Sequence, residues 1–275
     1  MEIIPLVSEW RLAQAGRSPR TVSERIRIVE LFARRQGVDP VHADWQAVAR
    51  FLANPALSDG TTLSYYAGLR AWFAWLVLGE VRPDNPTDRI AKPRCPRRYP
   101  RPISTEQLGR VLARVNRRRT KAMLLLGAYE GLRVHEIAKV RGQDFRAGGA
   151  LLEVIGKGGH RAALPVHAVV AELRSSFPRV GLWFPSYRDL TVPVTAKNVS
   201  AVLADAMRRA GVDATAHQLR HWYGTNVLVA AGGNIRTTQQ LMRHASIAST
   251  AIYTQISDEQ LRTAIAALPV PLRVA

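Results

Sequence analysis

The chain has 275 residues, of which 47% are hydrophobic, so it is long enough for two domains with sizeable cores. Its formal net charge of +18 favours attraction to phosphate-rich partners. Its one cysteine, Cys95, excludes an internal disulfide, and its apolar runs, such as WFAWLVLG, are too short to span a bilayer.

The N-terminal residues and the residue types that bind metals indicate where the protein acts and whether it binds a metal. The N-terminus, MEIIPLVSEW, lacks the basic start and the small-residue cleavage site of a signal peptide. We therefore expect a cytoplasmic location and no membrane partner. With one cysteine and scattered histidines, we expect neither a structural zinc site nor another bound metal.

The positive charge is unevenly distributed along the chain. Residues 1–90 carry 11 basic and 10 acidic side chains, residues 91–104 carry five basic and no acidic ones, and residues 105–275 carry 23 basic and 11 acidic ones. Attraction to phosphate should therefore come mainly from the last two segments. Arginine supplies 34 of the 39 basic side chains, and its planar fork can donate two hydrogen bonds to one phosphate. A high-GC genome accounts for most of the arginine-to-lysine ratio, but it does not account for the net excess of charge.

Residues 1–90 predict a small bundle of helices. The first residues, IIPLVSEWRLAQ, predict one helix, and the pair Ser18-Pro19 predicts the start of another that ends at Gly37. One face of this second helix is apolar, with hydrophobic residues at three- and four-residue steps: Val22, Ile26, Val29 and Phe32. Asp44 predicts the cap of a third helix, WQAVARFLA. After a turn at residues 58–60, TTLSYYAGLRAWFAWLVLGE predicts a long fourth one.

Residues 91–104, AKPRCPRRYPRPIS, form a boundary between two parts of the chain. Four prolines keep this segment out of helix and strand and leave it extended. The segment is either a solvated tether or a strap along a DNA backbone. We favour the strap, whose basic side chains would be Lys92, Arg94, Arg97, Arg98 and Arg101.

Residues 105–275 predict further helices and one β-hairpin. Ser104 and Gln107 have the spacing of a capping box ahead of a helix at 105–115. A second helix is expected at 119–130, and LLEVI and RAALPV predict two strands joined by the glycine-rich turn GKGGH. Later helices are expected at 167–176, 195–210, 217–231, 235–242 and 258–267. The predicted fold is mainly α with a small β-hairpin, in the α+β class.

Five short motifs in the second part contain side chains suited to handling a phosphate. They are GLRVHEI with Arg133, GKGGHR with Lys157, HQLRH with His217 and Arg220, LMRH with His244, and a segment carrying Tyr253. Breaking a phosphodiester without metal requires cationic donors for the charge on the phosphoryl oxygens and a proton for the leaving oxygen. A side-chain nucleophile would conserve the bond energy in a covalent intermediate. The motifs supply each of these groups.

Arg133 and Arg220 are the candidate phosphate donors. Arg133 begins a short helix, VHEIAKV, and Glu136 one turn later can hold the arginine or cap the turn. Taken alone, Arg133 would be interpreted as a surface arginine on an exposed helix. His217 and Arg220, three residues apart, lie on one face of a helix, whereas we assign the adjacent His221 a structural role. The alternative for this motif is a helix that faces DNA but takes no part in catalysis.

Lys157 and Tyr253 are the candidate acid and nucleophile. A lysine whose pKa is lowered by nearby arginines can protonate a leaving oxygen, although glycine-rich turns often carry a solvated lysine. A phenol has an ordinary pKa of about 10, so attack at neutral pH needs cationic neighbours. The alternative for Tyr253 is a core aromatic. Metal-dependent hydrolysis fits poorly, because the acidic residues are scattered rather than clustered.

In this order, the motifs resemble those of the tyrosine recombinase family, which includes phage integrases and Xer-type recombinases. The resemblance covers residues 105–260. It implies a core-binding (DNA-clamping) helical domain at 1–90, a linker at 91–104 and a catalytic domain at 105–275 with a C-terminal packing tail. The tail would pack on its own domain or dock on a neighbouring protomer. The family often has glycine at the position of Arg243, so we expect Arg243 to contact DNA or to alter the local turn.

The resemblance also implies roles for the candidate residues. Tyr253 would attack a phosphate to form a 3′-phosphotyrosine, Lys157 would protonate the leaving group, and Glu136 would support the site. The phosphate would be held by Arg133, His217, Arg220 and His244. Four protomers would exchange strands of double-stranded DNA at paired core-type sites through a Holliday junction, with no cofactor.

The resemblance leaves several functions open. We expect a phage- or prophage-type integrase, acting on DNA in the cytoplasm of a bacterial host, with an accessory DNA-bending or directionality factor as a further partner. The alternatives are an Xer-like recombinase that resolves chromosomes or plasmids, a type IB topoisomerase-like nicking-closing enzyme, and a non-catalytic DNA-binding protein on the same scaffold.

Overall fold

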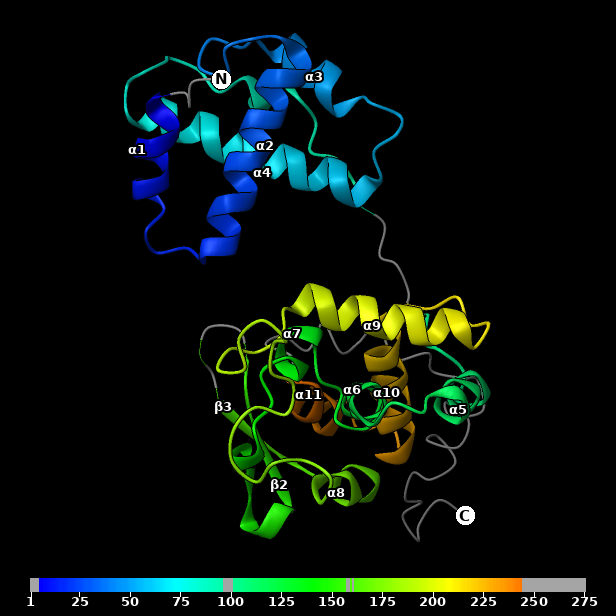
Figure 1. Ribbon diagram of the computed structural model, residues 1–275. Coiled ribbons are helices and arrows are strands. Elements are labelled where there is room, and N and C mark those ends of the chain that lie inside the picture. Colours follow the sequence, from blue (N-terminus) through cyan, green and yellow to red (C-terminus); the bar gives the residue numbers. More distant parts are fainter. Residues whose placement is uncertain (1–4, 96–100, 157–158, 160, 244–275) are drawn as a thin grey trace, which may run out of the picture. The chain divides into compact units, whose positions relative to one another are not determined.

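The computed structural model describes residues 5–95, 101–156, 159 and 161–243. The chain divides into two compact units, Met1–Arg98 and Tyr99–Ala275 (Figure 1). Among the helices in these described ranges, none is both long and apolar enough to cross a membrane.

The first unit is built from helices whose starts are fixed by side-chain caps. The helices are α1 (Pro5–Ala13), α2 (Pro19–Gln36), α3 (Trp45–Leu52), α4 (Asp59–Leu78) and a short 3-10 helix, η1 (Pro86–Arg89). Ser18 caps α2 by accepting from the Thr21 N–H, and Asp44 caps α3 by accepting from the Ala47 N–H. The predicted starts at Ser18 and Asp44 are confirmed.

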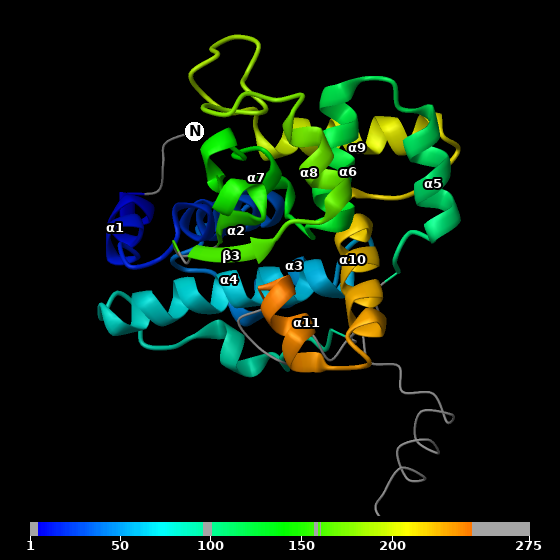
Figure 2. The ribbon, with the colours of Figure 1, turned by 90° about the horizontal axis from the view of Figure 1, so that it is seen from below.

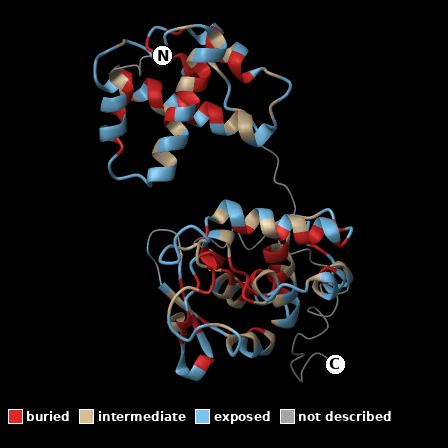
Figure 3. Ribbon diagram, viewed as in Figure 1, coloured by how far each residue is buried: buried red, intermediate tan, exposed pale blue. Residues whose placement is uncertain are grey.

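The long helix α4 differs at its start from the prediction and forms the centre of this unit. It begins at Asp59 rather than after the expected turn at 58–60, because the Ser58 side chain accepts from the Thr61 N–H. Trp72 is fully buried on α4 and packs edge-on against Trp10 of α1, with ring centroids 5.1 Å apart. Figure 3 shows the buried residues in red along the facing sides of α2 and α4.

The second unit combines seven helices in its described residues with a small sheet. The helices are α5 (Thr105–Arg114), α6 (Arg118–Tyr129), α7 (Val134–Ile137), α8 (Ala168–Arg174), α9 (Ala196–Arg209), α10 (Ala216–Ala230) and α11 (Ile235–Met242). Two 3-10 helices, η2 (Gly142–Asp144) and η3 (Ala147–Gly149), flank the start of the sheet. The helix expected at 258–267 lies outside the described residues.

The sheet contains the predicted hairpin and one strand that the sequence did not predict. Strands β2 (Leu151–Ile155) and β3 (Arg161–Pro165) are antiparallel, with Val154 opposite Ala162. A two-residue strand, β1 (Phe145–Arg146), pairs with β2 on its other edge, giving the order β1-β2-β3. A strand of two residues is too short to show the period-2 alternation by which strands are recognised.

Helix α6 is the central helix of the second unit and positions the segment that follows it. Its residues from Ala122 to Ala128 are all buried, so it is apolar around its whole circumference, as a core helix should be. It packs against α8, α9 and α10. Figure 2 shows α10 beside α11, where the chain turns back after Ala230. The predicted fold class, mainly helical with a small sheet, is confirmed.

Candidate active site

Arg133 lies in a tight turn between α6 and α7 that only glycine at position 131 allows. Gly131 has a φ of +59°, a left-handed conformation that side chains other than glycine seldom adopt. A Cβ added at Gly131 would also overlap the ring of Tyr223, which packs against the turn from α10. The turn places Arg133 at the residue directly before α7, with 34% of its side chain exposed.

Glu136 fixes Arg133 through both the backbone and the side chain. One carboxylate oxygen, Oε2, accepts the backbone N–H of Arg133 at 2.7 Å, and Oε1 accepts from its Nη1 at 3.1 Å. The sequence left open whether Glu136 holds the arginine or caps the turn, and the structure shows both interactions. The Glu136 side chain has no exposed surface.

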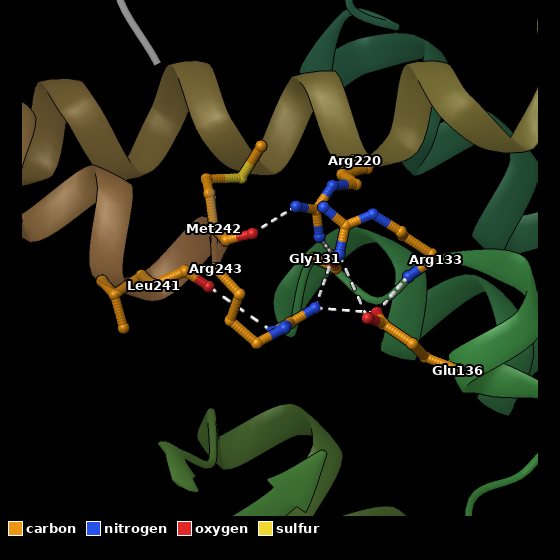
Figure 4. Close-up of polar contacts among 7 residues, drawn as sticks. All are labelled: Gly131, Arg133, Glu136, Arg220, Leu241, Met242 and Arg243. Carbon is orange, nitrogen blue, oxygen red and sulfur yellow. Dashed lines mark hydrogen bonds and ion pairs between the residues drawn. The ribbon is translucent and has the colours of Figure 1, made fainter. Parts of the chain in front are cut away.

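Arg220 reaches the same turn from α10. Arg220 is 2% exposed, and its guanidinium donates to the carbonyl oxygens of Gly131 and Met242 (Figure 4). These hydrogen bonds join the first turns of α10 to the turn after α6 and to the end of α11. In Figure 4, the Arg220 and Arg133 guanidiniums lie close together above Gly131 and Glu136.

Arg243 has an internal partner that the sequence did not predict. Its side chain is 8% exposed, and its Nη2 lies 2.8 Å from Glu136 Oε2 and 3.4 Å from the Gly131 carbonyl oxygen. Glu136 is 107 positions away in the chain, so no local pattern could have indicated this contact.

The electrostatics of the cluster keep Glu136 ionised. Burial raises the pKa of Glu136, but Arg243, the Arg133 N–H, the Arg133 side chain and Arg220 outweigh this effect, and the net pKa is lowered. Within the described part of the chain, three guanidiniums therefore surround one carboxylate. The resulting excess of positive charge suits a phosphate.

The histidines of HQLRH lie in the first turns of α10. The rings of His217 and His221 meet edge to face, with centroids 4.3 Å apart. Partial burial, followed by the positive charges of Arg220 and Arg133, lowers the pKa of His217. Burial, His217 and Arg220 lower the pKa of His221 to about 4, so the His221 ring is neutral at pH 7.

A second buried acid, Glu130, directly follows α6 and was not among the residues predicted from the sequence. Glu130 is 1% exposed, and its carboxylate accepts the backbone N–H of His167 at 2.9 Å. Burial raises its pKa to about 7, and Glu130 in turn adds to the effect of burial that raises the pKa of Tyr223 to about 12. The sequence offered no sign of this role beyond an acidic residue at the end of an apolar helix.

The structure describes only some of the remaining candidate residues. Lys92, Arg94 and Arg101 are exposed. Across the described ranges, no group of three or more His, Cys, Asp or Glu side chains is arranged to hold a metal ion. The candidates outside the described residues are Arg97, Arg98, Lys157, His244 and Tyr253.

The arginine turn, the HQLRH helix and the hairpin all fall in one stretch that matches a known family. The model of the phage integrase family matches residues 102–260, more than half of the chain. The chain belongs to the phage integrase family. Tyrosine recombinase XerD of Caulobacter vibrioides is 32% identical over 255 residues, covering 84% of this chain and 83% of that protein.

Solved structures agree with this membership in the phage integrase family. The integrase from mycobacterium phage Brujita is 41% identical, covering 95% of this chain and 91% of that one, with a TM-score of 0.51. A lambda integrase dimer bound to a COC′ core site has a TM-score of 0.73 at 16% identity, covering 90% and 97%, which shows the shared fold. This phage integrase-family chain is therefore a site-specific tyrosine recombinase, an enzyme of DNA recombination.

Proposed function

We propose that the chain is a phage- or prophage-type integrase that cuts and rejoins double-stranded DNA through a 3′-phosphotyrosine. The observation that carries this proposal is the convergence of Arg133 and Arg220 on one turn. Both contact Gly131 or Glu136, although they are far apart in the sequence. Fixed guanidiniums at one point can receive the negative charge of a phosphorane-like transition state without further rearrangement.

The chemical steps follow from the residues assigned to the site. The Tyr253 oxygen attacks the phosphorus, the bond from phosphorus to the 5′ oxygen breaks, and Lys157 gives that oxygen a proton. The products are a 3′-phosphotyrosine and a free 5′ hydroxyl. Attack by a 5′ hydroxyl from the partner strand reverses the step and releases the tyrosine, so rejoining needs no nucleotide.

The arginines and histidines have separate roles in this scheme. Arg133 and Arg220 hold the non-bridging oxygens, with Glu136 fixing Arg133. The lowered pKa of His217 favours its neutral ring, which can donate one hydrogen bond to a phosphate oxygen without adding charge. His244 would complete the set of donors. The reaction needs neither a metal nor another cofactor, since arginine and lysine supply the charge and the proton.

The proposed substrate is double-stranded DNA with paired core-type sites, on which four copies of the chain assemble and exchange strands through a Holliday junction. The basic residues of 91–104 and the excess charge of 105–275 would bind the DNA backbone. The likeness to the integrase of mycobacterium phage Brujita supports the phage-type assignment. An accessory DNA-bending or directionality protein would be a further partner, and the protein would act in the bacterial cytoplasm.

A second candidate function is Xer-like resolution of chromosomes or plasmids, which uses the same residues. The 32% identity to XerD of Caulobacter vibrioides favours it. Recombination assays separate the two functions. An integrase joins a phage attachment site to a different bacterial one, whereas an Xer-like enzyme recombines two copies of one chromosomal or plasmid site.

The proposed chemistry is tested with a nicked suicide duplex that carries the target site, in EDTA. The wild-type protein should form a covalent protein–DNA adduct, and Tyr253→Phe should form none. Tyr187→Phe is the matched control, because Tyr187 is 84% exposed in the same unit and should leave the adduct unchanged. An adduct that persists in Tyr253→Phe would assign the nucleophile to another residue.

A further inference from the structure

Arg243 adopts a backbone conformation that favours glycine. It ends α11 with φ 51° and ψ 47°, in the left-handed region, and its N–H donates to the Gln240 carbonyl oxygen at 3.0 Å. A non-glycine residue in this region is uncommon and is held there by its surroundings. What surrounds the Arg243 side chain therefore shows why an arginine is accommodated here.

The guanidinium of Arg243 points into the protein rather than into solvent. Its Nη2 donates to Glu136 Oε2 at 2.8 Å, and the same nitrogen lies 3.4 Å from the Gly131 carbonyl oxygen. Its Nη1 lies 3.5 Å from the Leu241 carbonyl oxygen. These three contacts hold the Arg243 guanidinium against Glu136, the turn at Gly131 and the end of α11.

Glu136 is consequently held by donors from two separate segments. Its Oε2 accepts both the Arg133 N–H and Arg243 Nη2, while its Oε1 accepts from Arg133 Nη1 (Figure 4). The Arg243 contact fixes the carboxylate that orients Arg133. It also offsets the negative charge of Glu136, which would otherwise reduce the attraction of Arg133 and Arg220 for a phosphate.

We propose that Arg243 is a positioning residue that acts through Glu136. It fixes the Arg133 guanidinium and ties the end of α11, one residue before His244, to the turn at Gly131. This inference rests on the proposed function of the site. It differs from a direct DNA contact by Arg243, because its effect on the reaction requires Glu136.

The first test separates binding from cleavage. Arg243→Met should slow adduct formation on the suicide duplex about 10- to 100-fold, because small displacements of a phosphate-binding group have effects of this size. The affinity for the intact site should stay within about twofold, and the slope of log K against log salt concentration should not change. A direct phosphate contact would instead reduce that slope by about 0.9, as Arg133→Met should do.

The second test is a double-mutant cycle with Glu136→Gln. In the Glu136→Gln background, Arg243 has no carboxylate to offset, so adding Arg243→Met should slow cleavage less than about threefold. Arg243→Lys keeps the charge and should recover part of the wild-type rate. Rate losses that multiply in the double variant would show that Arg243 acts independently of Glu136 and would overturn the proposal.

The two tests also separate failure of this inference from failure of the proposed function. If the wild-type protein forms no adduct, the proposed function is wrong. If the wild-type protein forms the adduct and Arg243→Met cleaves at the same rate, only the role of Arg243 is wrong. Should Arg243→Met alone fold poorly, the comparison of Glu136→Gln with the double variant decides, since neither leaves a buried carboxylate without its cation.

Discussion

Arg220 donates from α10 to the carbonyl oxygen of Gly131, a residue 89 positions earlier in the chain. At the same residue the backbone takes a positive φ, and the Tyr223 ring packs where a Cβ would otherwise be. The local turn, the core packing and the candidate phosphate site therefore depend on one another at this point.

Gly131→Ala should lower the free energy of unfolding by about 2–4 kcal/mol, from left-handed backbone strain and overlap with Tyr223. Gly211→Ala is the matched control, because Gly211 lies in the same unit with φ +69° and nothing within 4 Å of its added Cβ. The control should lose only about 1 kcal/mol, the strain alone. Urea unfolding measures both variants, and equal losses would show that the Tyr223 contact contributes nothing.

Glu130 should make the protein less stable as the pH rises. Its pKa is raised from 4.5 to about 7 in the folded state, so the folded chain retains a proton that the unfolded chain releases between those values. The contribution of Glu130 to the free energy of unfolding is fully present below pH 4.5. It falls as the pH rises through 7, by on the order of 3 kcal/mol.

Glu130→Gln removes this titration and can still accept the His167 N–H through its amide oxygen. The variant should match the wild-type protein in stability near pH 4.5 and exceed it at pH 8, as measured by urea unfolding at the two pH values. A variant that is less stable by the same amount at both values would show that the ionised carboxylate is not unfavourable in the fold.

Local patterns predicted the helices well, because caps and periodicity act over a few residues. Ser18, Asp44 and Ser104 each begin a helix as expected, and Gly37 ends one. The partners of Arg243 and Glu130 could not be predicted in this way. Their contacts, with Glu136 and His167, span 107 and 37 positions and depend on how the helices pack.

The contacts of the Arg133 motif could be predicted in part. The spacing to Glu136 allowed their contact to be predicted, since three residues make one helical turn. The position of Arg220 next to the same turn required α10 to pack on α6, and periodicity alone does not determine which helices meet.

Lys157→Ala should bind the DNA site normally and cleave slowly, because the leaving 5′ oxygen would lack its acid. A 5′-phosphorothiolate leaves as a thiolate, which needs no proton, so cleavage of this substrate by the variant should approach the wild-type rate. The cleavage rate of Lys157→Ala is divided by the wild-type rate, once on the normal duplex and once on the sulfur-containing duplex, and the two ratios are compared. Equal defects on both substrates would remove Lys157 from the acid role.

The basic linker should contribute to the salt dependence of DNA binding. Changing the five basic side chains of residues 91–104 to glutamine should reduce the slope of log K against log salt by about 4.5, if each contacts one phosphate. The control exchanges arginine and lysine at the same positions, which conserves the charge and should leave the slope unchanged. A slope that is unaffected by glutamine would show that the linker is a solvated tether.

The central claim is that Arg133 receives the charge of the phosphate under attack, and a neutral phosphate tests it most directly. On a normal suicide duplex, Arg133→Ala should form the covalent adduct about 100-fold or more slowly than the wild-type protein. On a duplex with a methylphosphonate at the scissile position, one charged oxygen is absent, and the defect of Arg133→Ala relative to the wild-type protein should shrink at least tenfold. A defect of the same size on both duplexes would contradict the account.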